Sequence, residues 1–389
     1  MVDFTNIKRA FADKSNTDLN RAYFLFKTIS SPRISSLLTN LVKFALLIRF
    51  PITKIIKITI YKHFCGGETI IDSKKTIDKL WKSSIGTILD YSAEGKQKEI
   101  DFNNVLNETI KVIRASRENK KIPFVVFKFT GLIKFNILEK LNNNNNNILN
   151  DNDQVEYNAF KEKLNIICKE MVLAKTPLLI DAEESWIQDS IDKIVLDLMK
   201  KYNHDKILIY NTLQFYRHDR IKYVNTILKQ SKKENFKLGL KLVRGAYHQQ
   251  EIERAKQKNY LPPVHLKKED TDKDFNESIK ICLDNIDHIS ICAGTHNEES
   301  SKILIKLMKE RGLKNNDKRI YSSQLLGMSD NISYNLSNEN FNVSKYVPYG
   351  PVKDVIPYLI RRAEENTSIS GQMGRELINI IDEKKRRNS

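Results

Sequence analysis

The sequence predicts an α/β fold of the (β/α)8-barrel type, and three observations support this prediction. From residue 85 onward, short β-branched or apolar runs alternate with longer amphipathic, lysine-rich stretches, which is the pattern of strands and helices around a parallel sheet. The runs number eight, as a closed barrel of this type requires. Polar residues lie at or just after the ends of these runs, where the active site of such a barrel lies.

The predicted strands are IGTILDY (85–91), IPFVVFKF (122–129), TPLLIDA (176–182), ILIYNTL (207–213), KLGLKLV (237–243), HISICAG (288–294), RIYSSQL (319–325) and SKYVPY (344–349). The polar residues at their ends are Asp90, Lys128, Asp181, Gln214, Lys241, Arg244, Thr295, His296, Gln324 and Tyr346. A single such residue could merely end a strand or cap a helix. Because the carboxyl ends of barrel strands meet at one mouth, we expect these side chains to form one site.

Composition excludes several classes of protein. The chain has 389 residues and a formal charge of +17, but its lysines are spread along the whole length among glutamate and asparagine. We therefore expect a solvated basic surface and no nucleic-acid partner. The cysteines, at positions 65, 168, 282 and 292, form no CxxC pair. This spacing favours neither a zinc site nor a disulfide framework, and a reducing compartment fits best.

The chain divides into three predicted parts. Residues 1–60 form an N-terminal extension, a helical arm that could hold a targeting segment, residues 61–372 form the barrel, and residues 373–389 form a basic polar tail. The apolar stretch 36–50 is interrupted by Lys43 and Arg49, so we expect a packed or interfacial helix and not a membrane span. The asparagine run 142–147, within the polar stretch 141–154, predicts an inserted loop.

A pair of adjacent arginines, Arg361 and Arg362, lies in the sequence LIRRAEEN (359–366). Paired guanidinium groups bind a carboxylate with bidentate geometry. Glu365 follows them by four and three residues, so it can orient either one on a helix. On a surface helix the same pair would face solvent, and the residues alone leave both interpretations open.

The motifs together resemble the proline dehydrogenase family, in its eukaryotic mitochondrial branch. They are HFCGGE (63–68), ILDYSAEG (88–95), LIDAEE (179–184), KLVRGAY (241–247), GTHN (294–297), SQLLGM (323–328), YVPYG (346–350) and YLIRRAEEN (358–366), and they cover roughly residues 60–370. The resemblance implies a distorted barrel that binds FAD, with its last helix over the barrel mouth. It also implies oxidation of L-proline to Δ1-pyrroline-5-carboxylate, the first step of proline catabolism to glutamate.

The resemblance further implies electron transfer to a membrane quinone, on the matrix side of the mitochondrial inner membrane. A basic surface and an apolar N-terminal helix would suit peripheral association with an anionic membrane. The expected partners are therefore proline, the quinone and the membrane surface.

Residue roles follow from the same resemblance. The expected catalytic residues are Asp181 and Lys241. The expected substrate-binding residues are Lys128, Tyr346, Tyr358, Arg361 and Arg362, with Glu94 as an ion-pair gate and Glu365 in support. The expected FAD-binding residues are Ala182, Gln214, Lys241, Arg244, Gly245, Ala246, His248, Thr295, His296, Asn297 and Gln324. No metal site is expected.

Three alternatives to this function are considered. A 4-hydroxyproline dehydrogenase would use the same fold and flavin, but related hydroxyproline enzymes carry a smaller residue at the position of Tyr346, so this tyrosine favours proline. A metal-dependent barrel hydrolase would use Asp181 and His296 as ligands, although few histidines lie at strand ends. A non-enzymatic basic binding protein would not need polar residues at every strand end.

Overall fold

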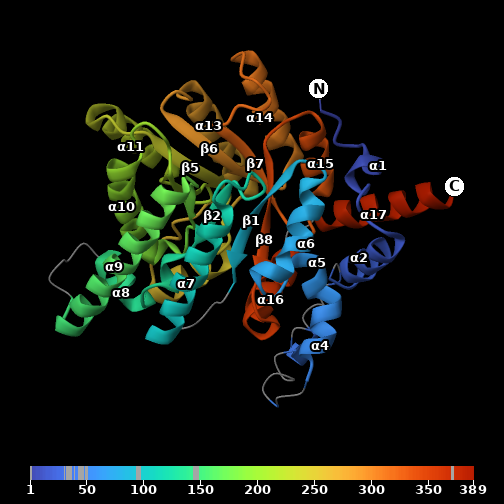
Figure 1. The fold of residues 1–389 in the computed structure, drawn as a ribbon, viewed down its shortest axis with the longest axis horizontal. Helices are drawn as coiled ribbons and strands as arrows, with labels where there is room; N and C mark the ends of the chain where they lie inside the picture. The colour runs from blue at the N-terminus through green and yellow to red at the C-terminus, as the bar shows by residue number, and fades with distance from the viewer. Residues whose placement is uncertain are drawn as a thin grey trace. The chain divides into compact units, whose positions relative to one another are not determined.

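The computed structural model describes residues 2–29, 31, 37–38, 40–42, 48, 51–92, 98–142, 149–368 and 372–389, with the side chains of 363–368 and 372–373 left out. Eight parallel strands close into a barrel in chain order (Figure 1), which confirms the predicted fold class. The strands are β1 (Ile85–Tyr91), β2 (Phe124–Phe127), β3 (Leu178–Ile180), β4 (Ile209–Gln214), β5 (Leu238–Val243), β6 (Ile289–Gly294), β7 (Ile320–Leu325) and β8 (Val343–Tyr349). Each overlaps one of the predicted runs.

The chain forms two compact units, one of residues 1–94 and 324–389 and the other of residues 95–323. The helices of the second unit are α7 (Glu99–Ser116), the 3-10 turn η2 (Phe129–Gly131), α8 (Phe135–Asn142), α9 (Asp151–Ala174), α10 (Ser185–Tyr202), α11 (Arg220–Glu234), α12 (His248–Lys258), α13 (Lys268–Asp284) and α14 (Glu298–Glu310). Those of the first unit are α1 (Ile7–Ala10), α2 (Asn16–Ile29), α4 (Thr53–Ile56), the π-helical turn η1 (Lys57–Tyr61), α5 (Lys62–Phe64), α6 (Ile70–Trp81), α15 (Asp330–Asn338), α16 (Val352–Ser368) and α17 (Gln372–Asn388).

In the second unit the apolar pattern of the sequence explains the alternation of strand and helix. Along α10, Ile187, Ile191, Val195 and Met199 recur every four residues and are buried. This spacing places them on one face of the helix. The whole of β4 is buried, as expected for a parallel strand that is covered on both sides. One or more helical segments connect each strand from β2 to β6 to the next one, and these neighbouring strands pair in parallel in chain order.

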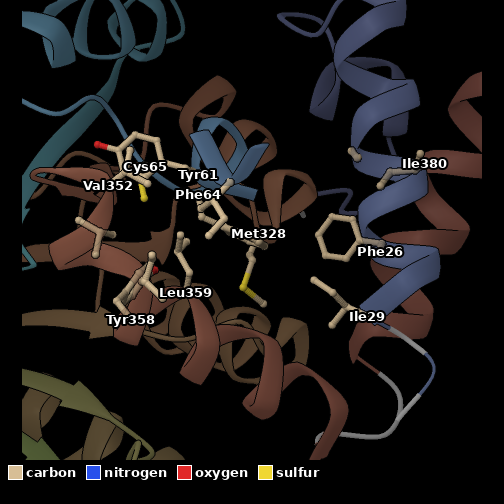
Figure 2. Packing of buried hydrophobic residues seen from close by; sticks show 14 of the residues in the cluster. Phe26, Ile29, Tyr61, Phe64, Cys65, Met328, Val352, Tyr358, Leu359 and Ile380 are labelled. Atoms are coloured by element: carbon tan, nitrogen blue, oxygen red, sulfur yellow. The ribbon is translucent and has the colours of Figure 1, made fainter. Parts of the chain in front are cut away.

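In the first unit one apolar cluster joins segments from the two ends of the chain (Figure 2). Phe26 of α2, Phe64 of α5, Met328, Leu359 of α16 and Ile380 of α17 are all buried in it. The residues predicted as a polar tail therefore lie in a helix that contributes Ile380 to the core. The many charged residues of α17 led to the prediction of a polar tail, although Ile380 is buried.

Buried charges join the N-terminal arm to β8. Asp330, at the start of α15, lies 2.8 Å from the Nζ atom of Lys345 and 3.2 Å from that of Lys14. The Lys345 side chain is fully buried and also donates a 2.5 Å hydrogen bond to the Met328 carbonyl. Burial alone would raise the pKa of Asp330, but the two lysine charges hold that pKa well below its usual range. The carboxylate thus stays ionised and compensates both cations.

Two of the predicted segments lie largely outside the described residues. One is the helix expected at 36–50. The other is the asparagine run between α8 and α9, whose first residue, Asn142, is the last residue of α8. Along the described stretches of the chain, no helix has the length and apolar character needed to cross a membrane.

Replacing Asp330 by asparagine should destabilise the protein by about 3–5 kcal/mol, because Lys345 would remain buried without its counter-charge. The free energy of unfolding measures this loss. Since the folded-state pKa of Asp330 is depressed, its contribution is fully present above the unfolded-state pKa of about 4 and is lost progressively as the pH falls from there through the folded-state pKa. The variant should therefore lose stability less steeply in acid than the parent.

Asp287→Asn is the matched control, because the Asp287 side chain is 97% exposed and pairs with Arg319 on the surface. It should change the stability by less than about 1 kcal/mol. Equal losses in the two variants would contradict the structural role given to Asp330.

Candidate active site

The second unit holds a buried ion pair between the two predicted catalytic residues. The Nζ atom of Lys241, in β5, lies 2.6 Å from Oδ1 of Asp181, which directly follows β3. Their side chains are only 9% and 12% exposed. Removing two charges from water costs several kcal/mol for each ion, and close contact between them offsets that cost. The pair therefore maintains a positive charge and its counter-ion inside the barrel.

Arg244, the first residue after β5, is held by partners from two other segments. Its guanidinium group donates to Oγ1 of Thr295 at 2.8 Å, to Oγ of Ser300 at 2.9 Å and to Oδ1 of Asp272 at 2.5 Å. It also lies over the ring of Phe275, 4.4 Å from the centroid. These contacts fix the orientation of the guanidinium group between the β5–α12 and β6–α14 connections.

The turn after Arg244 requires glycine. Gly245 has a φ of +132°, and a Cβ atom there would approach the ring of Tyr216 to 2.6 Å. The amide of Ala246 donates to Oε1 of Gln214 at 3.3 Å, while Nε2 of Gln214 donates to the Glu183 carbonyl at 2.7 Å. Gln214, the last residue of β4, therefore connects the turns that follow β3 and β5.

The connection after β6 ends in a capped helix. The amide of Asn297 donates to Oγ1 of Thr295 at 3.1 Å, and Oδ1 of Asn297 accepts from the amide of Ser300 at 3.1 Å. Asn297 is thus the N-cap of α14. His296, which lies between Thr295 and Asn297 in the sequence, is partly buried. Arg244 and the amino end of α14, each of which can favour an anion, therefore lie in the same region, together with the acidic Glu298 and Glu299 of the first helical turn.

Lys128 directly follows β2 and is electrostatically linked to a residue that the sequence analysis did not select. That residue is Glu183, which accepts hydrogen bonds from the amide and the hydroxyl group of Thr130. Burial raises the pKa of Glu183 to about 7, against the opposing effects of the Lys128 charge and the Thr130 hydrogen bonds. The available sequence signal was its position two residues after Asp181, with buried Ala182 between them.

His248, the first residue of α12, is engaged by the protein backbone. Its Nε2 atom lies 2.8 Å from the His265 carbonyl. The hydrogen bond fixes the ring close to Tyr216, with 6.3 Å between the ring centroids. His248 can therefore reach a cofactor only through the remaining atoms of its ring.

The first unit contains the other predicted site residues. Tyr346, in β8, is buried, and its carbonyl accepts from the amide of Leu326 at 2.9 Å. On α16, Tyr358 is buried and the guanidinium group of Arg362 lies 5.5 Å from its ring centroid. Arg361, next to Arg362, is partly buried. The arginine pair therefore does not lie on a fully solvated helix face.

Gln324 and Asp90, also in the first unit, are each held by a neighbouring serine. The side-chain oxygen of Gln324 accepts from the Ser333 hydroxyl group at 2.8 Å, so α15 orients that amide. Asp90 accepts from the Ser92 hydroxyl group at 3.1 Å. Glu94 and the side chain of Glu365 lie outside the described residues. Among the side chains that are described, no three His, Cys, Asp or Glu residues form a metal-ligand group.

Comparison with known proteins gives a family and close relatives. The family model described as proline dehydrogenase matches residues 73–375. Proline dehydrogenase 1, mitochondrial, from Dictyostelium discoideum is 31% identical over an alignment of 426 positions, which covers 97% of this chain and 74% of that protein. Proline dehydrogenase 2, mitochondrial, from Arabidopsis thaliana is 29% identical over an alignment of 424 positions, which covers 97% of this chain and 89% of that protein.

A solved structure shows the same fold. Proline utilization A from Bdellovibrio bacteriovorus, inactivated by N-propargylglycine, matches with a TM-score of 0.73 at 18% identity. The match covers 95% of this chain and 40% of that one, so this chain spans less than half of the larger protein. Because the family model extends over more than half of the 389 residues, this chain belongs to the proline dehydrogenase family.

Proposed function

We propose that this protein oxidises L-proline to Δ1-pyrroline-5-carboxylate as an FAD-dependent proline dehydrogenase, the first step of proline catabolism to glutamate. The observation that carries the proposal is the extent of the family match. Residues 73–375 include every strand-end residue described above and the arginine pair on α16. The substrate and the cofactor can therefore be assigned to named side chains.

Three cations would bind the proline carboxylate. Arg361 and Arg362 would provide a bidentate clamp, and Lys128 would add a third positive charge. Tyr346 and Tyr358 are buried and would pack against the apolar ring of the substrate. Fixing both the carboxylate and the ring would orient the C5–H bond for transfer, and positioning of this kind accounts for a large part of enzymatic catalysis.

The Lys241–Asp181 pair would supply the electrostatic part of the mechanism. When bound, FAD supplies the hydride-accepting chemistry at its N5 atom. A buried lysine stabilises negative charge that develops near it, and Asp181 holds the ammonium group in place at 2.6 Å. The ring amine of proline would be neutral at the moment of transfer.

The residues around Arg244 fit the cofactor. A fixed guanidinium group and the amino end of α14, with Thr295, His296 and Asn297, would hold the FAD pyrophosphate and ribose. Gly245 would let the backbone approach the cofactor closely. The remaining proposed FAD contacts are Ala182, Gln214, Ala246, His248 and Gln324. Glu94 would close over bound substrate by pairing with Arg361, and Glu365 would support that arginine.

The proposed setting is the mitochondrion, because the Dictyostelium and Arabidopsis relatives are mitochondrial proline dehydrogenases. We further propose that a membrane quinone receives the electrons on the matrix side of the inner membrane. The formal charge of +17 would favour peripheral binding to an anionic membrane surface.

Anaerobic addition of L-proline to the purified, FAD-loaded protein should bleach the visible flavin bands, and 4-hydroxyproline should bleach them more slowly. Absorption spectroscopy measures both rates. Flavin bands that neither imino acid bleaches would contradict the proposed substrate. Protein that retains no flavin after reconstitution with FAD would contradict the function as a whole.

Replacing Arg361 by methionine should raise the half-saturating proline concentration at least about tenfold, because a charged hydrogen bond to the carboxylate would be lost. Its flavin content should not change. Arg311→Met is the control, since Arg311 pairs with Asp284 on the surface of the second unit. Proline binding that is equally affected in both variants would contradict the clamp.

Replacing Tyr346 by serine should increase turnover of 4-hydroxyproline relative to proline, because the smaller side chain leaves room for the substrate hydroxyl group. The ratio of kcat/KM for the two substrates is the measurement. An unchanged ratio would contradict the specificity role of Tyr346.

A further inference from the structure

We infer that Tyr61 and Glu68 are positioning residues for substrate binding. They belong to the segment Tyr61–Glu68, which lies upstream of the family match and includes the motif HFCGGE. This segment fixes the turn between β8 and α16, and α16 carries Arg361 and Arg362. The inference rests on the proposed function, because it assigns these arginines to the proline carboxylate.

Backbone hydrogen bonds join the segment to the β8–α16 turn. The amide of Gly66 donates to the Pro348 carbonyl at 2.8 Å, and the amide of Gly350 donates to the Gly67 carbonyl at 3.1 Å. A Cβ atom on Gly66 would lie 2.6 Å from Cγ1 of Val347, so the close approach of the two chains needs glycine at this position. The turn is therefore paired with the N-terminal segment in both directions.

Tyr61 attaches the same turn through its side chain. Its hydroxyl group donates a buried 2.8 Å hydrogen bond to the carbonyl of Gly350, and only 3% of the residue is exposed. The ring belongs to the same apolar cluster as Val352, Tyr358 and Leu359 on α16 (Figure 2). Tyr61 thus contacts the helix through its ring and the preceding turn through its hydroxyl group.

Glu68 acts at the amino end of α16. Its Oε2 atom accepts from the amide of Val352, the first residue of the helix, at 3.3 Å. The first amides of a helix have no partner within the helix, and a negative charge there also interacts favourably with the helix dipole. The other carboxylate oxygen pairs with Lys57, which holds Glu68 in this orientation. Pro357 removes one hydrogen bond inside α16, so the first turn depends more on such outside partners.

Because Arg361 and Arg362 lie far along α16 from its first turn, a small tilt at that turn changes their positions. Arg361 follows Val352 by nine residues, or about 14 Å at the helical rise per residue. A tilt of about 5° at the first turn would therefore move Arg361 by about 1 Å. A displacement of that size is enough to impair a positioned catalytic group substantially.

The test uses the full-length, FAD-loaded protein with Tyr61→Phe and Glu68→Gln, which remove one hydroxyl group and one charge. Tyr223→Phe and Glu234→Gln are the controls. Tyr223 of α11 lies in the second unit with its ring centroid 4.6 Å from the guanidinium group of Arg220, and Glu234 pairs with Lys200 at 3.1 Å. Anaerobic flavin reduction is measured over a range of proline concentrations. The half-saturating concentration should rise about three- to tenfold in the two test variants only, with unchanged flavin content.

A double-variant cycle separates positioning from general stability. In the Arg361→Met background, Glu68→Gln should have a much smaller effect on half-saturation, because its effect acts through that arginine. An unchanged half-saturating concentration in the single variants would overturn the inference, as would an equal effect of Glu68→Gln in both backgrounds. Wild-type flavin that proline does not bleach would refute the proposed function and this inference with it. Bleaching of the wild type with unaffected variants would refute this inference alone.

Discussion

The need to compensate buried positive charge is the constraint on which this barrel depends. Lys241 lies in the second unit with Asp181 at 2.6 Å, and the fully buried Lys345 lies in the first unit with Asp330 at 2.8 Å. Leaving either cation unpaired in a low-dielectric interior would cost about 3–5 kcal/mol, a large share of the stability of an ordinary domain. The two pairs thus have different consequences. One places a cation and its counter-ion together in the interior of the second unit, and the other joins β8 to the start of α15 and the N-terminal arm.

The first unit shows how the chain outside the barrel strands supports α16. Its apolar cluster combines Phe26 from the N-terminal arm, Phe64 from the HFCGGE motif, Leu359 from α16 and Ile380 from α17. The helix with the arginine pair is therefore packed against segments from both ends of the chain. The proposed substrate clamp on α16 would need such support, because the first amide of the helix relies on Glu68 as its partner and the helix contains Pro357.

The eight strands could be predicted because runs buried on both faces are continuously apolar, and barrel topology explains why Asp181, after β3, and Lys241, in β5, form a pair. The hydrogen-bond and ion-pair partners of the site residues could not be predicted. Asp272 follows Arg244 by 28 residues, and Glu68 precedes Val352 by 284, so only tertiary packing brings each pair together. Strand length was also overestimated, since TPLLIDA has seven residues whereas β3 spans Leu178–Ile180. The polar composition of residues 373–389 concealed a helix that buries Ile380.

We propose that Lys128, Arg361 and Arg362 together hold the carboxylate of proline. The most direct measurement is a crystal structure of the FAD-loaded protein with a five-membered ring carboxylic acid that cannot be oxidised because it lacks the amine. We expect the carboxylate to lie within hydrogen-bonding distance of all three cations, with the ring against Tyr346 and Tyr358. A carboxylate bound elsewhere, with the arginine pair facing solvent, would contradict it.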